Sequence, residues 1–264
     1  MCFYRTANVR YQNVRYGSWA RQEKNDRSLS LSRLDPSLLA GLPTFEGLSG
    51  EDLDTILSRA TALRVAKDAA IFEQGAEAKS FFVLLDGQVR VVKPTPDGRQ
   101  VIVRYIVPGE LLGIAQALGR DTYPASAIAA VDCVVLSWPG KLWAEFASSF
   151  PSFGKATYKT VGARLEDVQM QMVDMATKQV EQRIAHALLR LVRQSGKKTD
   201  DGITIDFPLS RQDIAEMTGT TLHTVSRFLS AWEEKGLVKS GRQQVSVTQP
   251  HKLMLLAEGR NDRD

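Results

Sequence analysis

Short apolar runs separated by glycine turns characterise the chain from about residue 63 to 138. The expected strands lie at residues 70–72, 81–85, 88–92, 101–107 and 131–136. Asp86-Gly87 and Asp97-Gly98 provide the positive φ angles that tight hairpin turns require. Ahead of this region, Ser49 with Asp52 three positions later predicts the capped start of a helix. Several short strands at this spacing predict a small antiparallel roll.

The apolar spacing changes at Pro151, where a long helix is expected to begin. Six residues then recur at alternating intervals of three and four: Tyr158, Val161, Leu165, Val168, Met172 and Met175. That alternation places them in one narrow seam, as in a two-stranded coiled coil. We expect this seam to form a homodimer interface, and packing of the helix on its own sheet is the alternative.

The rest of the chain has the pattern of a compact, mainly helical unit. The expected elements are a helix at 184–192, a polar turn at 196–201, a strand at 203–205, a helix opening after Ser210, a helix at 221–235 and a strand at 245–247. Ser210 is followed three residues later by Asp213, which repeats the capping pattern seen at residue 49.

Residues 211–230 fit the steric pattern of a helix-turn-helix unit. Ala215 is small where two helices would cross, and Gly219 permits a tight turn. The expected shared core is Ile214, Val225 and Phe228. A helix pair that does not bind DNA would satisfy the same positions. The polar start of the second helix favours DNA, because major-groove helices read bases near their N-terminus.

The expected DNA contacts combine this polar helix start with basic side chains nearby. They are Arg211, Gln212, Thr221, Leu222, His223, Thr224, Ser226, Arg227 and Arg242. Arg227 suits a bidentate contact to guanine, with Ser226 and His223 on neighbouring base edges or phosphates. Arg211 and Gln212 open the first helix and suit backbone phosphates, and Arg242 would reach the phosphate chain from a wing.

Charge follows the same division of the chain. The total is 34 basic and 30 acidic side chains, a net charge of +4. Residues 1–30 contribute six basic and two acidic groups, residues 31–175 contribute 14 and 17, and residues 176–264 contribute 14 and 11. An acidic block therefore precedes a basic one, and the basic excess of the second lies where phosphates would be met.

Other function classes find little support in the sequence. Cys2 and Cys133 are too few for a disulfide framework or a four-ligand metal site, and Cys133 is expected to be a small buried strand residue. No uncharged apolar stretch approaches the roughly 20 residues that span a bilayer, so we expect a cytoplasmic protein with no membrane segment. Metalloprotease and phosphate-loop motifs are missing, which argues against an enzyme.

Several motifs together resemble the Crp/Fnr family of bacterial transcription regulators, over residues 40–250 or so. They are Asp86-Gly87-Gln88-Val89, Pro108-Gly109-Glu110-Leu111, the run 209–215 (Leu-Ser-Arg-Gln-Asp-Ile-Ala) and Thr224-Val225-Ser226-Arg227. Residues 220–227 are most similar to the NnrR branch, which regulates nitrite and nitric oxide reduction. The resemblance implies an α+β protein with a cyclic-nucleotide-binding-like β-roll (35–150), a dimerisation helix (151–177) and a winged helix-turn-helix (178–264). A basic arm, residues 1–34, precedes them.

The resemblance also implies a function. A homodimer would bind pseudo-palindromic double-stranded DNA with TTG-like half-sites, contact RNA polymerase and respond to nitric oxide. One alternative is a regulator of the same type with no bound effector, controlled by its abundance. Another is a small-molecule-binding module that acts on a protein partner.

The ligand is less clear than the fold, because residues that the family uses are missing. Glu110 matches a residue that contacts cyclic AMP in the family, but residues 123–127 lack the family's arginine, so cyclic AMP is not the expected ligand. Two cysteines cannot hold an iron–sulfur cluster. The branch implies haem, yet His186, His223 and His251 all lie outside the roll, which leaves Tyr or Cys as axial ligands.

Overall fold

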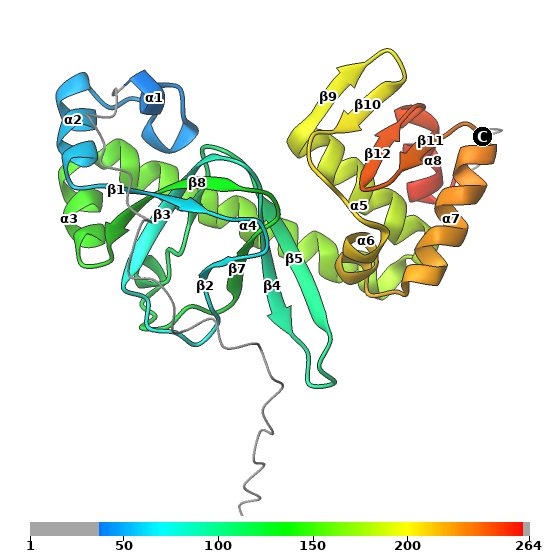
Figure 1. Cartoon of the computed structure of the whole chain (residues 1–264), viewed down its shortest axis with the longest axis horizontal. Coiled ribbons are helices and arrows are strands. Elements are labelled where there is room, and N and C mark those ends of the chain that lie inside the picture. Colours follow the sequence, from blue (N-terminus) through cyan, green and yellow to red (C-terminus); the bar gives the residue numbers. More distant parts are fainter. Residues whose placement is uncertain (1–36, 261–264) are drawn as a thin grey trace, which may run out of the picture.

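Two four-stranded antiparallel sheets form the N-terminal half of the computed structural model, which describes residues 37–260 (Figure 1). One sheet has the order β1 (Thr61–Val65), β8 (Cys133–Pro139), β3 (Ser80–Asp86), β6 (Leu111–Leu112). The other has the order β2 (Ala70–Phe72), β7 (Ser126–Ala129), β4 (Val89–Pro94), β5 (Gln100–Ile106). The predicted roll is confirmed. The predicted arm at 1–34, with Cys2, lies outside the described residues.

Three of the eight roll strands, β1, β6 and β7, had not been predicted. Strand β6 has only two residues, and β7 reads Ser-Ala-Ile-Ala, so neither carries the run of large apolar residues that signals a strand. The predicted Asp86-Gly87 turn does connect β3 to β4. Gly87 has φ +93°, and a Cβ there would lie 2.6 Å from the carbonyl oxygen of Asp132, so only glycine fits.

Short helices cover one end of the roll. They are α1 (Ser37–Ala40), the 3₁₀ turns Pro43–Phe45 and Gln116–Leu118, α2 (Gly50–Ser58) and α3 (Leu142–Ser149). The predicted cap of α2 is confirmed, because the Ser49 side chain accepts from the Asp52 amide while the Asp52 carboxylate accepts from the Ser49 amide. Trp138 is buried beneath these helices and donates from its indole N–H to the Ile56 carbonyl oxygen at 2.8 Å.

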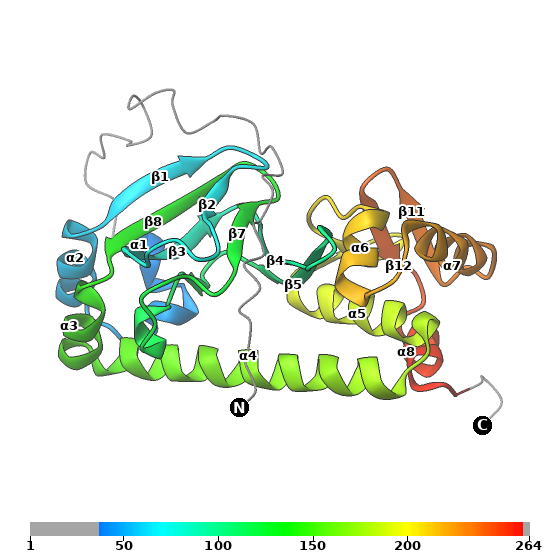
Figure 2. The same ribbon diagram turned by 90° about the horizontal axis from the view of Figure 1, so that it is seen from below.

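The long helix α4 (Pro151–Thr177) runs below both halves of the molecule (Figure 2). Its first turns are buried against the roll through Phe153, Gly154 and Thr157. The chain then reverses at Lys178, whose backbone is extended, and α5 (Val180–Ser195) returns alongside α4. Arg190 of α5 pairs with Asp174 of α4 at 3.1 Å.

The C-terminal unit packs helices against a third antiparallel sheet. The sheet has the order β11 (Val238–Gly241), β12 (Gln244–Val247), β10 (Gly202–Ile205), β9 (Gly196–Thr199), and the helices are α5, α6 (Arg211–Thr218), α7 (Leu222–Glu234) and α8 (Pro250–Glu258). Its core includes Ile184, Leu188, Val225, Leu229 and Trp232. We refer to this unit, residues 180–260, as the head.

Two predictions for the head were wrong. Residues 196–199, expected within a polar turn, form strand β9, which is exposed along its whole length and so lacks the alternation that predicts a strand. His251, expected in a tail, lies in helix α8, which the sequence pattern had not indicated. Within residues 37–260, no helix is both long and apolar enough to cross a bilayer.

Candidate nucleic-acid interface

Helix α6 begins where the sequence predicted, at a capping box. The Ser210 hydroxyl accepts from the Asp213 amide at 3.0 Å, and the Asp213 carboxylate accepts from the Ser210 amide at 2.8 Å. Each bond satisfies a backbone N–H that the first helical turn leaves free. The first two helical residues, Arg211 and Gln212, are therefore held at a fixed helix start.

Gly219 separates the two helices of the motif. It has φ +62° and caps α6 with its N–H bonded to the Ala215 carbonyl oxygen. A Cβ at this position would lie 2.7 Å from the Met175 Cε atom of α4, so the turn packs tightly on the long helix. Ala215 and Ile214 are buried as predicted, and Val225 is fully buried beside them.

The N-terminal face of α7 is exposed to solvent. Thr221 caps the helix through its hydroxyl, which accepts from the Thr224 amide at 3.2 Å. Thr221, Leu222, His223 and Arg227 are exposed, whereas Thr224 and Ser226 are half-buried. The guanidinium of Arg227 lies 5.2 Å from the centre of the Phe228 ring. This face thus presents three hydroxyls, an imidazole and a guanidinium within two helical turns.

The two arginines predicted to contact phosphates on either side of α7, Arg211 and Arg242, differ in exposure. Arg242 is exposed in the two-residue turn between β11 and β12, beside Gln243, whose carbonyl oxygen accepts from the Leu209 amide at 3.0 Å. Arg211 instead is half-buried and donates to the Ser240 hydroxyl at 3.1 Å. Arg211 therefore ties the start of α6 to the wing strand β11, a contact that sequence reasoning missed because it joins residues 29 apart.

Five of the six predicted seam residues of α4 are exposed in the single chain. They are Tyr158, Leu165, Val168, Met172 and Met175, with Tyr158 80% exposed and Met172 68%. Val161 differs, because it packs against the apolar core of the roll. Arg164, which precedes the seam residue Leu165 in the sequence, turns to the roll and donates to the Leu111 carbonyl oxygen.

Two family models match the chain. The model described as a cyclic nucleotide-binding domain matches residues 62–150, and the Crp-like helix-turn-helix domain matches residues 182–256. Together they cover more than half of the chain. The chain belongs to the Crp/Fnr family. It is a transcription regulator of that type, with a DNA-binding helix-turn-helix domain.

Relatives within the Crp/Fnr family align over most of the chain. The cyclic AMP receptor protein of Thermus thermophilus is 27% identical over 84% of this chain and 99% of its own. The nitrogen fixation regulation protein FixK of Azorhizobium caulinodans is 29% identical over 72% of this chain and 76% of its own. Among solved structures, FixK2 from Bradyrhizobium japonicum matches with TM-score 0.67 and 25% identity, covering 75% of this chain and 96% of that one.

The roll of this Crp/Fnr chain holds a charged cluster that the sequence did not reveal. Glu110 pairs with Arg104 of β5, and Arg164 approaches from α4. Burial, together with the nearby Arg104, lowers the pKa of Arg164 to about 10, although Glu110 acts in the opposite direction. The Arg164 Nε atom is buried and has no hydrogen-bond partner among residues 37–260. Residues 123–127 carry no basic side chain, so the guanidiniums at Glu110 come from other elements.

Neither Cys133 nor Tyr123 of the roll is suited to ligate a haem. Its three candidate histidines lie in α5, α7 and α8 of the head. Cys133 is buried, its thiol contacts the carbonyl oxygens of Gln88 and Val131, and burial raises its pKa, which disfavours a thiolate ligand. The Tyr123 hydroxyl donates to the Ser80 carbonyl oxygen at 2.7 Å, and burial raises its pKa as well. Both side chains are engaged in holding the roll together.

Proposed function

We propose that the chain is a sequence-specific regulator that reads a pseudo-palindromic DNA site with the N-terminal face of α7. The observation that carries the proposal is the exposed polar surface formed by Thr221, His223 and Arg227, together with the exposed Arg242 of the turn between β11 and β12. Arg227 would read guanine in the major groove, with His223 and Ser226 on neighbouring base edges or phosphates. Arg242 and Gln212 would hold phosphates on either side, with Arg211 positioned for the same chain through Ser240.

The DNA-binding form of the protein would be a homodimer. Apolar side chains of α4 stand exposed along the predicted seam, and an exposed stripe of this kind marks an interaction surface. A second copy would cover it and place two α7 helices about 34 Å apart, one turn of DNA. TTG-like half-sites and contact with RNA polymerase are proposed with the dimer, on the resemblance to the family.

We also propose that the regulated genes belong to nitrogen-oxide respiration, with nitric oxide as the signal. Support comes from the amino-acid sequence of residues 220–227, which resembles that of the NnrR branch. The test is full-length protein, purified without oxygen, assayed for DNA binding before and after addition of nitric oxide. A change in affinity supports the proposal; unchanged affinity, with normal binding beforehand, contradicts it.

The DNA-reading proposal is tested by Arg227→Ala. We expect the affinity for a duplex selected by the wild-type chain from a randomised pool to fall about 10- to 100-fold, as for loss of one bidentate base contact. Fluorescence anisotropy measures the dissociation constant. Arg193→Ala is the matched control, because it removes the same charge from an exposed site on α5 of the same unit.

Arg193→Ala should retain affinity within about twofold, the loss expected for a single charge away from the interface. Equal losses in the two variants would point to general charge attraction rather than base reading. Failure of the wild-type chain to select any duplex would overturn the proposed function as a whole.

A further inference from the structure

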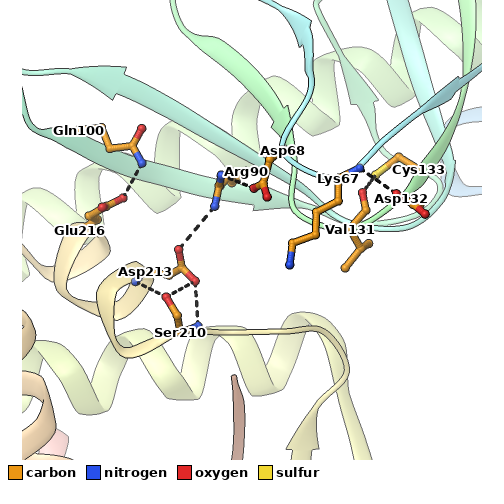
Figure 3. Close-up of polar contacts among 10 residues, drawn as sticks. All are labelled: Lys67, Asp68, Arg90, Gln100, Val131, Asp132, Cys133, Ser210, Asp213 and Glu216. Atoms are coloured by element: carbon orange, nitrogen blue, oxygen red, sulfur yellow. Dashed lines mark hydrogen bonds and ion pairs between the residues drawn. The ribbon is translucent and has the colours of Figure 1, made fainter. Parts of the chain in front are cut away.

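Helix α6 is held by the roll on its acidic side and by the head on its basic side. The hairpin formed by β4 and β5 packs on the head, where the rings of Tyr105 and Phe207 lie 4.6 Å apart. Gln100 of this hairpin donates to the Glu216 carboxylate of α6 at 3.0 Å (Figure 3). Arg211, at the start of the same helix, instead contacts the wing, which consists of β11, β12 and the turn between them.

Two separate hydrogen bonds fasten the wing to the start of α6. Arg211 donates to the Ser240 hydroxyl at 3.1 Å, and the Leu209 amide donates to the Gln243 carbonyl oxygen at 3.0 Å. Gln243 has φ +59°, a left-handed backbone that is costly for a residue with a side chain. The bond from Leu209 stabilises that turn. The turn that carries Arg242 therefore has a support of its own, separate from Ser240.

The backbone of Ser240 is held by an acidic side chain of α7. Its amide donates to the Glu233 carboxylate at 2.6 Å, and both residues are half-buried. Strand β11 is at the edge of its sheet, so its outward amides have no strand partner and need another acceptor. Glu233 lies in the last turn of α7, where the helix dipole disfavours a carboxylate. The bond to Ser240 compensates both groups and connects α7 to α6 through one serine.

The charge of Arg211 remains available for a phosphate. Within residues 37–260, its guanidinium donates to Ser240 and forms no ion pair with a carboxylate. A guanidinium has several N–H donors in one rigid plane, so one of them can be fixed by Ser240 while others meet a phosphate. The position of Ser240 therefore sets the direction in which Arg211 presents its charge.

We propose that Glu233 is a positioning residue of the DNA interface, which strengthens DNA binding although it carries a negative charge. The proposal rests on the proposed function, because that function assigns Arg211 to the phosphate chain. Glu233 fixes the backbone of Ser240, and the Ser240 hydroxyl then directs Arg211. Without the carboxylate, the Arg211 side chain has to be ordered by DNA itself, which lowers the affinity.

The test compares Glu233→Ala with Glu234→Ala, because both remove one acidic side chain from the last turn of α7. Glu234 is exposed, and loss of its negative charge should leave the affinity unchanged or raise it up to about twofold. Glu233→Ala should instead bind about fivefold more weakly, the cost of ordering one long side chain at an interface. Fluorescence anisotropy with the duplex selected by the wild-type chain gives both dissociation constants.

Two further variants separate positioning from a general loss of structure. Glu233→Gln keeps an oxygen that can accept from the Ser240 amide, so it should recover most of the affinity that Glu233→Ala loses. In a chain that already carries Arg211→Ala, Glu233→Ala should cost less than about twofold, because the side chain through which it acts is gone.

Ser240 provides a second pair of variants that leaves α7 unchanged. Ser240→Ala keeps the amide that binds Glu233 but removes the hydroxyl that binds Arg211, and should weaken DNA binding about fivefold. Ser240→Thr retains a hydroxyl and should restore the affinity. Ser246→Ala is the matched control, because it removes a hydroxyl of β12 that contacts Thr204 at 2.7 Å, and it should leave the affinity unchanged.

The outcomes distinguish this proposal from the proposed function. If the wild-type chain selects a duplex but Glu233→Ala binds as tightly as Glu234→Ala, or loses as much affinity in the Arg211→Ala background, Glu233 has no positioning role and DNA reading stands. If circular dichroism shows that Glu233→Ala does not fold, the Ser240 variants decide, and equal affinity of Ser240→Ala and Ser240→Thr overturns the proposal. If the wild-type chain selects no duplex, both are wrong.

Discussion

Single residues decide the charge balance inside the roll. Arg104 and Glu110 form a pair in which each side chain is about a quarter exposed. Arg164 adds a second guanidinium, which forms no ion pair with a carboxylate in the part of the chain that the structure describes. Desolvation disfavours such an unpaired charge, which is why the pKa of Arg164 falls. Glu110 therefore offsets two cations, and its loss should cost more than the pair alone.

Glu110→Gln tests this balance. We expect the free energy of unfolding to fall by about 1–2 kcal/mol, less than for a fully buried pair because solvent screens part of the interaction. Adding Arg164→Met to Glu110→Gln should recover at least half of that loss, since it removes the unpaired cation. Urea denaturation measures both, and strictly additive losses would contradict the shared role of Glu110.

The exposed face of α7 was predictable residue by residue, whereas its surroundings were not. Thr221, His223 and Arg227 lie on the solvent side of an amphipathic helix, and helical periodicity alone places them there. Arg211 and Arg164 escaped the same reasoning because their partners, Ser240 and the Leu111 carbonyl, are distant in sequence. Local periodicity says which way a side chain points but not what it meets.

At the scale of elements, the same Ser-x-x-Asp capping box begins two helices that have different roles. Ser49 with Asp52 caps α2 on the roll, and Ser210 with Asp213 caps α6 in the head. Both were predicted from sequence, because a capping box acts over four residues and needs no tertiary partner. Strand β9 and helix α8 were missed, since pairing and packing rather than local patterning define them.

Ser49→Ala and Ser210→Ala form a matched pair of cap deletions. Each should lower the free energy of unfolding by about 1 kcal/mol, the usual cost of losing a cap. Only Ser210→Ala should also weaken DNA binding, because α6 supports the reading helix. Denaturation curves and anisotropy titrations measure the two effects, and equal weakening of DNA binding by Ser49→Ala would refute the assignment of α6.

At the scale of the whole molecule, α4 connects everything else. Its first turns are buried in the roll, its middle carries the exposed seam, and its last turn packs through Met175 on the Gly219 turn. Movement of one copy of α4 against another would therefore reach the head through the Met175–Gly219 contact and the Arg190–Asp174 pair. The sequence predicted the helix and its seam, but not the glycine against which it ends.

The seam is tested by Leu165→Glu. A carboxylate at this exposed position, 58% accessible in the single chain, should separate the proposed dimer and abolish binding to a two-half-site duplex. Sedimentation velocity reports the mass and anisotropy the binding. Ala163→Glu adds the same charge on the opposite face of α4 and should leave both unchanged; a monomeric wild-type chain would refute the dimer.

The apolar contact between Tyr105 and Phe207 bears on how such proteins diversify. Recombination at Lys178, after α4, would join this roll to the head of another protein. Tyr105, Val92 and Ile102 would then face a head surface that did not evolve to pack against them. The head must therefore be inherited together with the β4–β5 hairpin, whose last residue, Ile106, lies 72 residues before Lys178. Exchange of DNA specificity between relatives is easier by changing exposed residues of α7 than by swapping whole heads.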